Sequence, residues 1–162
     1  MNPAVRHPYI VVNATFVIAL VLTAIPLPGW LDLLRPEWAA LALIYWCMAL
    51  PERVGVGIGW IWGLFLDVMR AGLLGENALS FSLIAYVTHH LYQRVRVFPM
   101  WQQALSVMVL IIMHQMLILW VKGITGLASH SWTYWLPSLT SMLIWPLIFT
   151  LLRFLRRHFK LA

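Results

Sequence analysis

Apolar residues along the chain fall into six runs, and the short stretches between them hold many of the charged residues. A helix that crosses the hydrocarbon core of a bilayer needs about 20 predominantly apolar residues. Because backbone N–H and C=O groups in lipid must be paired within the chain, we predict one helix for each run. The runs are residues 9–27, 36–50, 54–70, 73–92, 102–121 and 135–155, of which the second is short.

The connections between these runs are too short to hold a separate soluble domain. The longest, near 27–37 and 122–134, contain about a dozen residues each. We therefore predict one all-α membrane domain over residues 1–162, built from six transmembrane helices. The runs 54–70 and 73–92 are nearly continuous and should form a tight antiparallel pair. The stretch after 9–27 lacks a small-residue cleavage site, so we expect that run to be an uncleaved first span.

Composition agrees with this prediction. The chain is 62% hydrophobic and only 10% charged, whereas about a quarter of the residues of a soluble domain are charged. The mean hydropathy is +0.84. Such a chain has too little polar surface to cover a water-soluble globule, which excludes a soluble domain.

The distribution of basic residues predicts the orientation. An even number of crossings places both termini on one side of the membrane. Most of the 11 lysine and arginine residues fall on that side, namely Arg6, Arg53, Arg94, Arg96, Arg153, Arg156, Arg157 and Lys160. Arg35, Arg70 and Lys122 fall on the other side. Because cytoplasmic loops are enriched in Lys and Arg, we predict that both termini are cytoplasmic.

Glycines recur every four residues in the third run, at Gly55, Gly59 and Gly63, and Asp67, Ala71 and Gly75 continue the spacing. Four residues turn a helix by about 400°, so these positions form a slowly winding stripe with little side chain. Small residues at this spacing allow another helix backbone to approach closely. We predict a packing face, within the bundle or against a partner, and favour the first. A dinucleotide-binding loop would need a preceding strand, which this run lacks.

Asp67 is the carboxylate of the third run, and three interpretations stay open. A carboxylate at the centre of a membrane helix costs about 2.5–3.5 kcal/mol. Asp67 can lie half-solvated near the outer surface, with Arg70 neutralising it. It can instead pair inside the bundle with a polar group, or with a basic residue of a partner. A role in a proton or ion relay would require further acids within the membrane.

Two further groups of polar residues are candidates for interactions. His114 and Gln115 lie mid-run in "IIMHQMLIL", where hydrogen bonds between helices are expected in preference to ligand binding. The tail after the last run carries Arg153, Arg156, Arg157 and Lys160. Each basic residue near an anionic membrane surface contributes about 1 kcal/mol, so we predict a cytoplasmic lipid anchor. Lipid accounts for these charges, and the net charge of +6 therefore does not indicate nucleic-acid binding. We expect no catalytic residue, metal site or cofactor.

The segment "RPEWAALALIYWCMALPERVGVGIGWIWGLFLDVMRAGLLGENALSFSLIAY", residues 35–86, resembles the rod shape-determining protein MreD family. The matching features are Arg35-Pro36, "YW", "ALP", the glycine-spaced run, Asp67 and Gly75. "WQQAL" at 101–105 and "WP" at 145–146 are also similar. The family pattern suggests a polar or acidic residue in the fifth run, and this chain has His114-Gln115 there.

The resemblance implies a non-enzymatic scaffold of the cell-elongation machinery in the bacterial inner membrane, which helps to organise peptidoglycan synthesis and cell shape. It implies a single-span partner, MreC, and a wider complex with the actin-like MreB, the RodA glycosyltransferase and a class B penicillin-binding transpeptidase. Arg35 and Asp67 would be polar fixtures at the outer end of the bundle.

The resemblance also implies a fold similar to the six-helix substrate-binding subunits of energy-coupling-factor vitamin transporters. That similarity leaves an alternative function open, which is small-molecule or lipid binding. The cavity would be lined by Asp67, His114, Gln115 and tryptophans.

Overall fold

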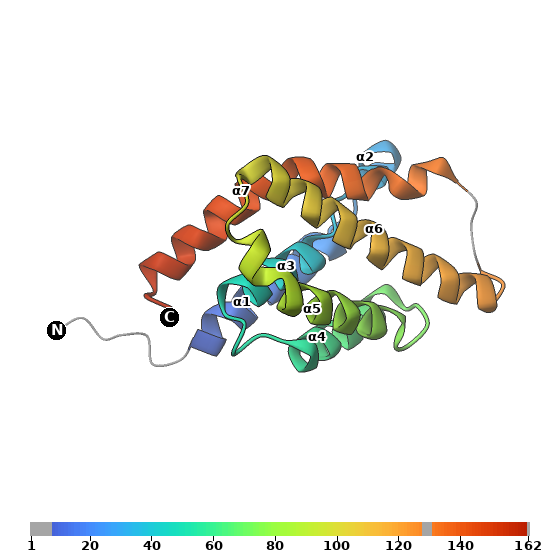
Figure 1. Cartoon of the computed structure of the whole chain (residues 1–162). Helices are drawn as coiled ribbons and strands as arrows, with labels where there is room; N and C mark the ends of the chain where they lie inside the picture. The colour runs from blue at the N-terminus through green and yellow to red at the C-terminus, as the bar shows by residue number, and fades with distance from the viewer. Residues whose placement is uncertain (1–7, 128–130, 162) are drawn as a thin grey trace.

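The computed structural model describes residues 8–127 and 131–161 and is helical throughout, with no strand in those residues (Figure 1). Arg6, one of the residues used to predict the orientation, lies outside this part. The elements are α1 (Pro8–Ala24), α2 (Gly29–Leu33), α3 (Trp38–Ala49), α4 (Val56–Arg70), α5 (Glu76–Val95), α6 (Met100–Ile124), the 3-10 turn η1 (Trp132–Trp135) and α7 (Leu136–His158). The six longer helices confirm the predicted number of helices.

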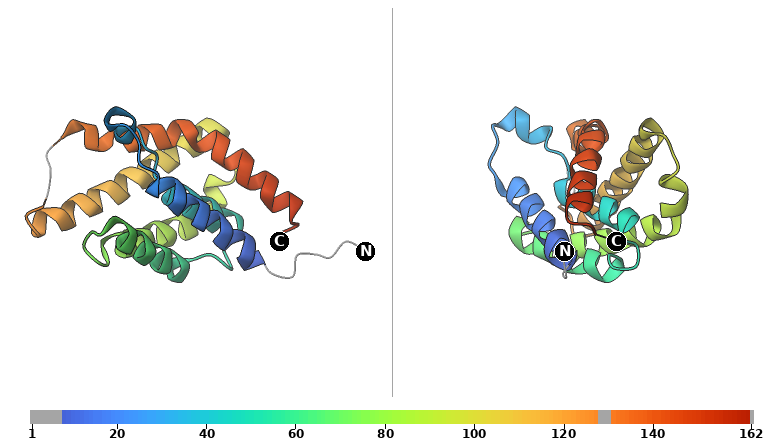
Figure 2. Two further views of the ribbon diagram at one scale, coloured as in Figure 1. Left: turned by 180° about the vertical axis from the view of Figure 1, so that it is seen from behind. Right: turned by 90° about the vertical axis from the view of Figure 1, so that its left-hand side faces the viewer.

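Helix α3 is the centre of the bundle. Every residue from Ala39 to Met48 is buried, and α1, α5 and α7 all pack against it. A helix that is apolar all round is expected to be buried on every side. Figure 2 shows α3 enclosed by the longer helices when the bundle is viewed along its length. The short second run is therefore the core helix around which the others assemble.

The connections alternate between the two ends of the bundle. The α3–α4 and α5–α6 connections lie at the end where α1 begins and α7 finishes, and the α4–α5 connection lies at the opposite end (Figures 1 and 2). Helices α4 and α5 pack against each other more extensively than any other pair. They form the antiparallel pair that their short connection predicts.

The helix ends differ from the predicted runs for local reasons. Helix α1 ends at Ala24 and not at residue 27 because Pro26 and Pro28 cannot continue it. The unforeseen helix α2 occupies part of the connection that follows. Helix α4 ends at Arg70, after which Ala71 has a φ of 50°, so the small-residue stripe does not continue helically to Gly75. Helix α5 starts at Glu76, three residues later than predicted.

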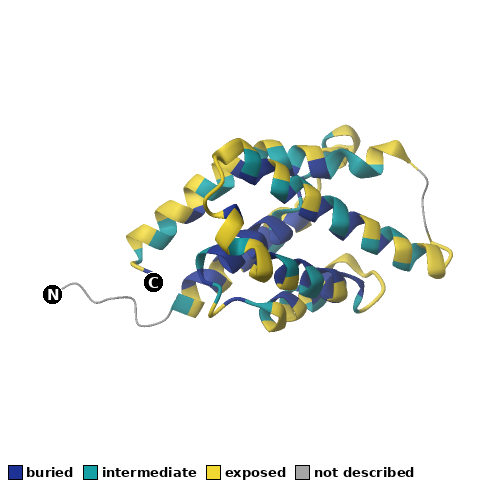
Figure 3. Ribbon diagram, in the orientation of Figure 1, coloured by how far each residue is buried: buried dark blue, intermediate teal, exposed yellow. Residues whose placement is uncertain are grey.

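Two helical segments within the described residues are long and apolar enough to cross a membrane, Met100–Ile124 and Trp132–His158, and Pro8–Ala24 is a shorter apolar helix. Large apolar side chains are exposed on these helices, including Val109, Trp120, Leu143 and Leu147. Figure 3 shows exposed positions along the outer surfaces of α6 and α7. Such flanks suit contact with lipid. That all six long helices cross the bilayer stays a prediction.

Candidate functional site

Asp67, at the end of α4, is buried and binds the first turn of α5. Its Oδ1 accepts hydrogen bonds from the Asn77 backbone N–H at 2.9 Å and from Asn77 Nδ2 at 2.8 Å. Its Oδ2 accepts from the N–H groups of Gly75 at 2.8 Å and Ala78 at 3.3 Å. The first N–H groups of a helix have no partner within it, and the helix dipole favours a negative charge there. Asp67 thus caps α5 from the neighbouring helix.

This geometry decides between the interpretations of Asp67. The side chain is 1% exposed, so the half-solvated position near the surface is wrong. Arg70 does not neutralise it, because Arg70 Nη2 lies 3.3 Å from Glu37 Oε2. The carboxylate instead pairs inside the bundle with backbone N–H groups and one amide side chain. Its two oxygens accept from four donors, which fix the start of α5.

The glycine stripe of α4 faces α5. A Cβ on Gly63 would lie 2.4 Å from Ala78 Cα, and one on Gly59 would lie 2.9 Å from the Phe81 carbonyl oxygen. Both helices therefore approach to backbone contact at these positions. The close contact does not extend along the helix to Gly55, because nothing lies within 4 Å of a Cβ there. Gly75 has a φ of 102°, a left-handed conformation that L side chains rarely adopt, and it supplies the turn before α5.

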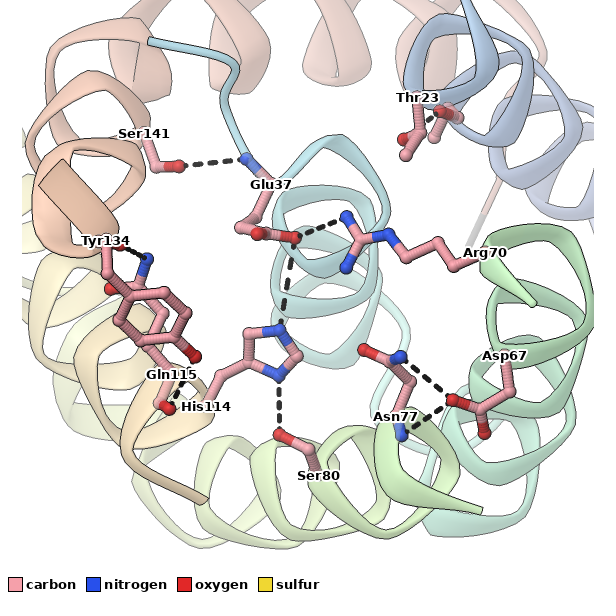
Figure 4. Close-up of polar contacts among 11 residues, drawn as sticks. Thr23, Glu37, Asp67, Arg70, Asn77, Ser80, His114, Gln115, Tyr134 and Ser141 are labelled. Atoms are coloured by element: carbon pink, nitrogen blue, oxygen red, sulfur yellow. Dashed lines mark hydrogen bonds and ion pairs between the residues drawn. The ribbon is translucent and has the colours of Figure 1, made fainter. Parts of the chain in front are cut away.

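Four polar side chains form a chain at the end of the bundle that carries the α4–α5 connection (Figure 4). Ser80 of α5 is hydrogen-bonded to His114 Nδ1 of α6. His114 Nε2 lies 3.9 Å from Glu37 Oε2, which also binds Arg70. Glu37 precedes α3 and Arg70 ends α4, so this chain joins four helices. Because lipid supplies no hydrogen-bond partners, such internal pairs hold the helices in register.

Further contacts extend the same cluster to α7 and to η1. The Glu37 N–H donates to Ser141 Oγ at 3.1 Å. Gln115 Nε2 donates to the Tyr134 carbonyl at 2.9 Å, and the Tyr134 hydroxyl donates to the Gln115 carbonyl at 2.8 Å. The sequence-predicted His114 and Gln115 are thus brought into one network, with partners from α5, η1 and the residue before α3.

Arg35 lies apart from this network. Its guanidinium donates to the carbonyls of Thr23 and Ile25 at the end of α1 and forms an ion pair with Asp32 of α2 at 2.7 Å. Carbonyls at a helix C-terminus lack partners within the helix, and a cation there also complements the helix dipole. Arg35 therefore closes α1 and ties α2 to it.

A cavity of about 280 Å³ opens beside the network and is lined in part by Glu37, Arg70, His114, Gln115 and Tyr134. It differs from the cavity expected for a small-molecule-binding protein in two respects. Asp67 is committed to the start of α5 and does not line it, and no tryptophan lines it.

An apolar groove runs over α3 between α1 and α7. Its lining residues are Thr15, Ile18, Ala19, Leu22, Trp38, Ala42, Ile148, Leu151, Leu152 and Leu155. Ala19 and Ala42 are buried, and Ile18 and Leu151 are more than half exposed. Small buried side chains therefore form part of its floor, and branched apolar side chains border it.

Apolar helices with exposed lipophilic flanks, joined internally by paired polar groups, are the construction of a helical membrane protein. A family model for the rod shape-determining protein MreD matches residues 6–155. The rod shape-determining protein MreD of Haemophilus influenzae is 35% identical over 146 residues, which cover 90% of each chain. The chain therefore belongs to the MreD family of membrane proteins, which have a role in determining rod shape. No solved structure matches the chain.

Proposed function

We propose that this protein is a non-enzymatic, multi-pass scaffold of the bacterial inner membrane that binds the transmembrane helix of an MreC-like single-span partner. Through that partner it would help to organise peptidoglycan synthesis in a wider complex with MreB, RodA and a class B transpeptidase. Family membership supports the role in cell shape. The apolar groove between α1 and α7 is the observation that supports the mode of binding.

The groove fits a helix better than it fits a soluble ligand. Association of helices in lipid depends on close van der Waals packing, which small residues at the contact permit. Ala19 and Ala42 provide such positions in the floor, and Ile18, Leu22 and Leu151 provide apolar borders. Because α1 and α7 both pack on α3, the groove is part of a fixed frame.

The glycine face is not available for the partner. Gly59 and Gly63 are already in contact with α5, and their surface is buried. The partner helix would therefore use another face, and the groove between α1 and α7 is lined by no residue of α4 or α5.

Both termini are placed in the cytoplasm in this proposal. The α3–α4 and α5–α6 connections, at the end where α7 finishes (Figure 1), carry Arg53 and Arg96. Arg94 lies in the last turn of α5, and α7 itself ends in Arg156 and Arg157. Basic residues near the ends of membrane helices favour the cytoplasmic side. Reporter fusions at the two ends should both report a cytoplasmic location.

The groove is tested by co-purification of the tagged chain with an MreC-like partner from membranes. The double variant Ile18→Ala/Leu151→Ala removes apolar contact from both borders of the groove. Because both side chains are more than half exposed, the fold should survive and retention of the partner should fall.

The matched control is Val17→Ala/Leu147→Ala. These residues are exposed on the same two helices but do not line the groove, so the partner should be retained as by the unaltered chain. Equal loss in the two double variants would show that the groove is not the binding site. Full retention in the groove variant would show the same.

A further inference from the structure

A pocket of about 260 Å³ lies at the end of the bundle where α7 finishes. Four arginines from two separate segments line it. Arg96 comes from the α5–α6 connection, and Arg153, Arg156 and Arg157 come from the last turns of α7. Arg96 lies at least 57 positions from the other three arginines in the sequence, yet all four line one pocket. A basic tail that only contacts the membrane surface would not need this convergence.

The positive charge of this pocket is not balanced by the protein. Over residues 8–127 and 131–161, the ion pairs involve Arg35, Arg70 and His114, all remote from the pocket. Each of the four guanidinium groups therefore lacks an acidic partner there. Guanidinium groups bind phosphate through paired N–H donors, and their charge is retained at all physiological pH values.

A buried hydroxyl provides a second, independent sign of a ligand. Tyr45 of α3 lines the pocket and is 2% exposed, yet its hydroxyl makes no hydrogen bond of ordinary geometry with the described residues, although the Arg156 guanidinium lies near it. Buried polar groups are nearly always paired, so an unpaired one calls for a missing partner. Gln103, by contrast, is fixed by bonds from Trp145 Nε1 at 3.1 Å and to the Val95 carbonyl at 3.2 Å, so the wall beside Tyr45 is ordered.

We propose that this pocket binds a phosphate group, with the four arginines as cationic donors and the Tyr45 hydroxyl as a neutral donor. The source is the headgroup of an anionic phospholipid in the adjacent leaflet. The binding would then be a defined site, and not only the diffuse attraction expected of a basic tail.

Two observations favour a lipid headgroup over a soluble phosphate. The connection that carries Arg96 also exposes Val97 and Phe98, and the first turn of α6 exposes Trp101. Such side chains suit the boundary between headgroups and acyl chains. The pocket is also smaller than the roughly 300–1,000 Å³ typical of sites for drug-sized ligands. It can hold a headgroup while the acyl chains remain in the bilayer.

The experiment measures binding of phosphatidylglycerol to the purified full chain in nanodiscs of phosphatidylcholine, by native mass spectrometry and by titration. The pocket variant is Arg96→Gln/Arg156→Gln. The control, Arg94→Gln/Lys160→Gln, removes the same charge from exposed residues at the same end that do not line the pocket. Tyr45→Phe removes the hydroxyl without changing the charge.

The pocket variant should weaken phosphatidylglycerol binding by about tenfold or more, because charge-assisted hydrogen bonds are lost. The control should bind phosphatidylglycerol almost as tightly as the unaltered chain does. Tyr45→Phe should also weaken it. Equal weakening in the two double variants, or no effect of Tyr45→Phe, would overturn the proposal in favour of diffuse attraction.

Two further arms identify the source of the phosphate. Competition by inorganic phosphate at low concentration, with the same dependence on the variants, would overturn the lipid assignment. Binding of an acidic peptide with this dependence and no preference for phosphatidylglycerol would overturn the phosphate assignment. Retention of the MreC-like partner by the pocket variant would show that the groove is intact, so the two proposals can fail separately.

Discussion

Replacing Asp67 with asparagine tests whether this carboxylate holds α4 and α5 together. An amide keeps one oxygen, which can serve either the two donors of Asn77 or the N–H groups of Gly75 and Ala78, but not both. A buried donor without a partner costs about 1–3 kcal/mol, and loss of a negative charge at a helix N-terminus costs about 0.3–1 kcal/mol more. We therefore expect Asp67→Asn to lower the free energy of unfolding by about 2–4 kcal/mol.

The assay is equilibrium unfolding in mixed micelles, followed by the fluorescence of the 10 tryptophans. Asp32→Asn is the matched control, because the Asp32 side chain is 57% exposed in its ion pair with Arg35. It should cost at most about 1 kcal/mol. Arg70→Gln should cost more than this control, because it leaves the mostly buried Glu37 carboxylate without its ion-pair partner. If Asp67→Asn cost no more than Asp32→Asn, the capping role would be refuted.

Two glycine substitutions test the same α4–α5 pair by other routes. Gly63→Ala places a Cβ 2.4 Å from Ala78 Cα and should destabilise the chain by about 3 kcal/mol or more, because backbone cannot move aside as a side chain can. Its control is Gly57→Ala, which has nothing within 4 Å of its Cβ and should be neutral or stabilising. An equal loss of stability in both variants would contradict the close contact. Gly75→Ala should cost about 1–3 kcal/mol through strain at a φ of 102°, whereas Gly123→Ala within α6 should not, and equal unfolding midpoints for these two would contradict it.

The sequence predicted the number of helices and placed most of their ends within a few residues. It succeeded because lipid demands long apolar runs, and because proline and glycine interrupt them. The start of α5 was harder to predict from the sequence. Its position depends on Gly75 adopting a left-handed conformation and on Asp67 reaching its first N–H groups. A carboxylate shortly before a glycine and the start of an apolar run was the available signal.

The network around Glu37 and His114 was predicted only in part. His114 and Gln115 are conspicuous as polar residues in the middle of an apolar run, and hydrogen bonds between helices were expected for them. Their partners could not be predicted, since Ser80 is 34 residues from His114 and Glu37 is 33 residues from Arg70. Such pairs depend on how the helices are arranged around α3, which periodicity within one helix does not encode.

The two ends of the bundle differ in how their charged groups are used. At the end that carries the α4–α5 connection, Glu37, Asp67 and Arg70 are all bound to other parts of the same chain, so these groups stabilise the fold. At the end where α7 finishes, Arg96 and Arg156 line a pocket and form no ion pair within the described residues. Like charges held close together repel and lower stability, so a bound phospholipid headgroup would stabilise this end by offsetting that repulsion. Charge at the first end is therefore balanced within the chain, whereas charge at the second end would be balanced by the proposed ligand.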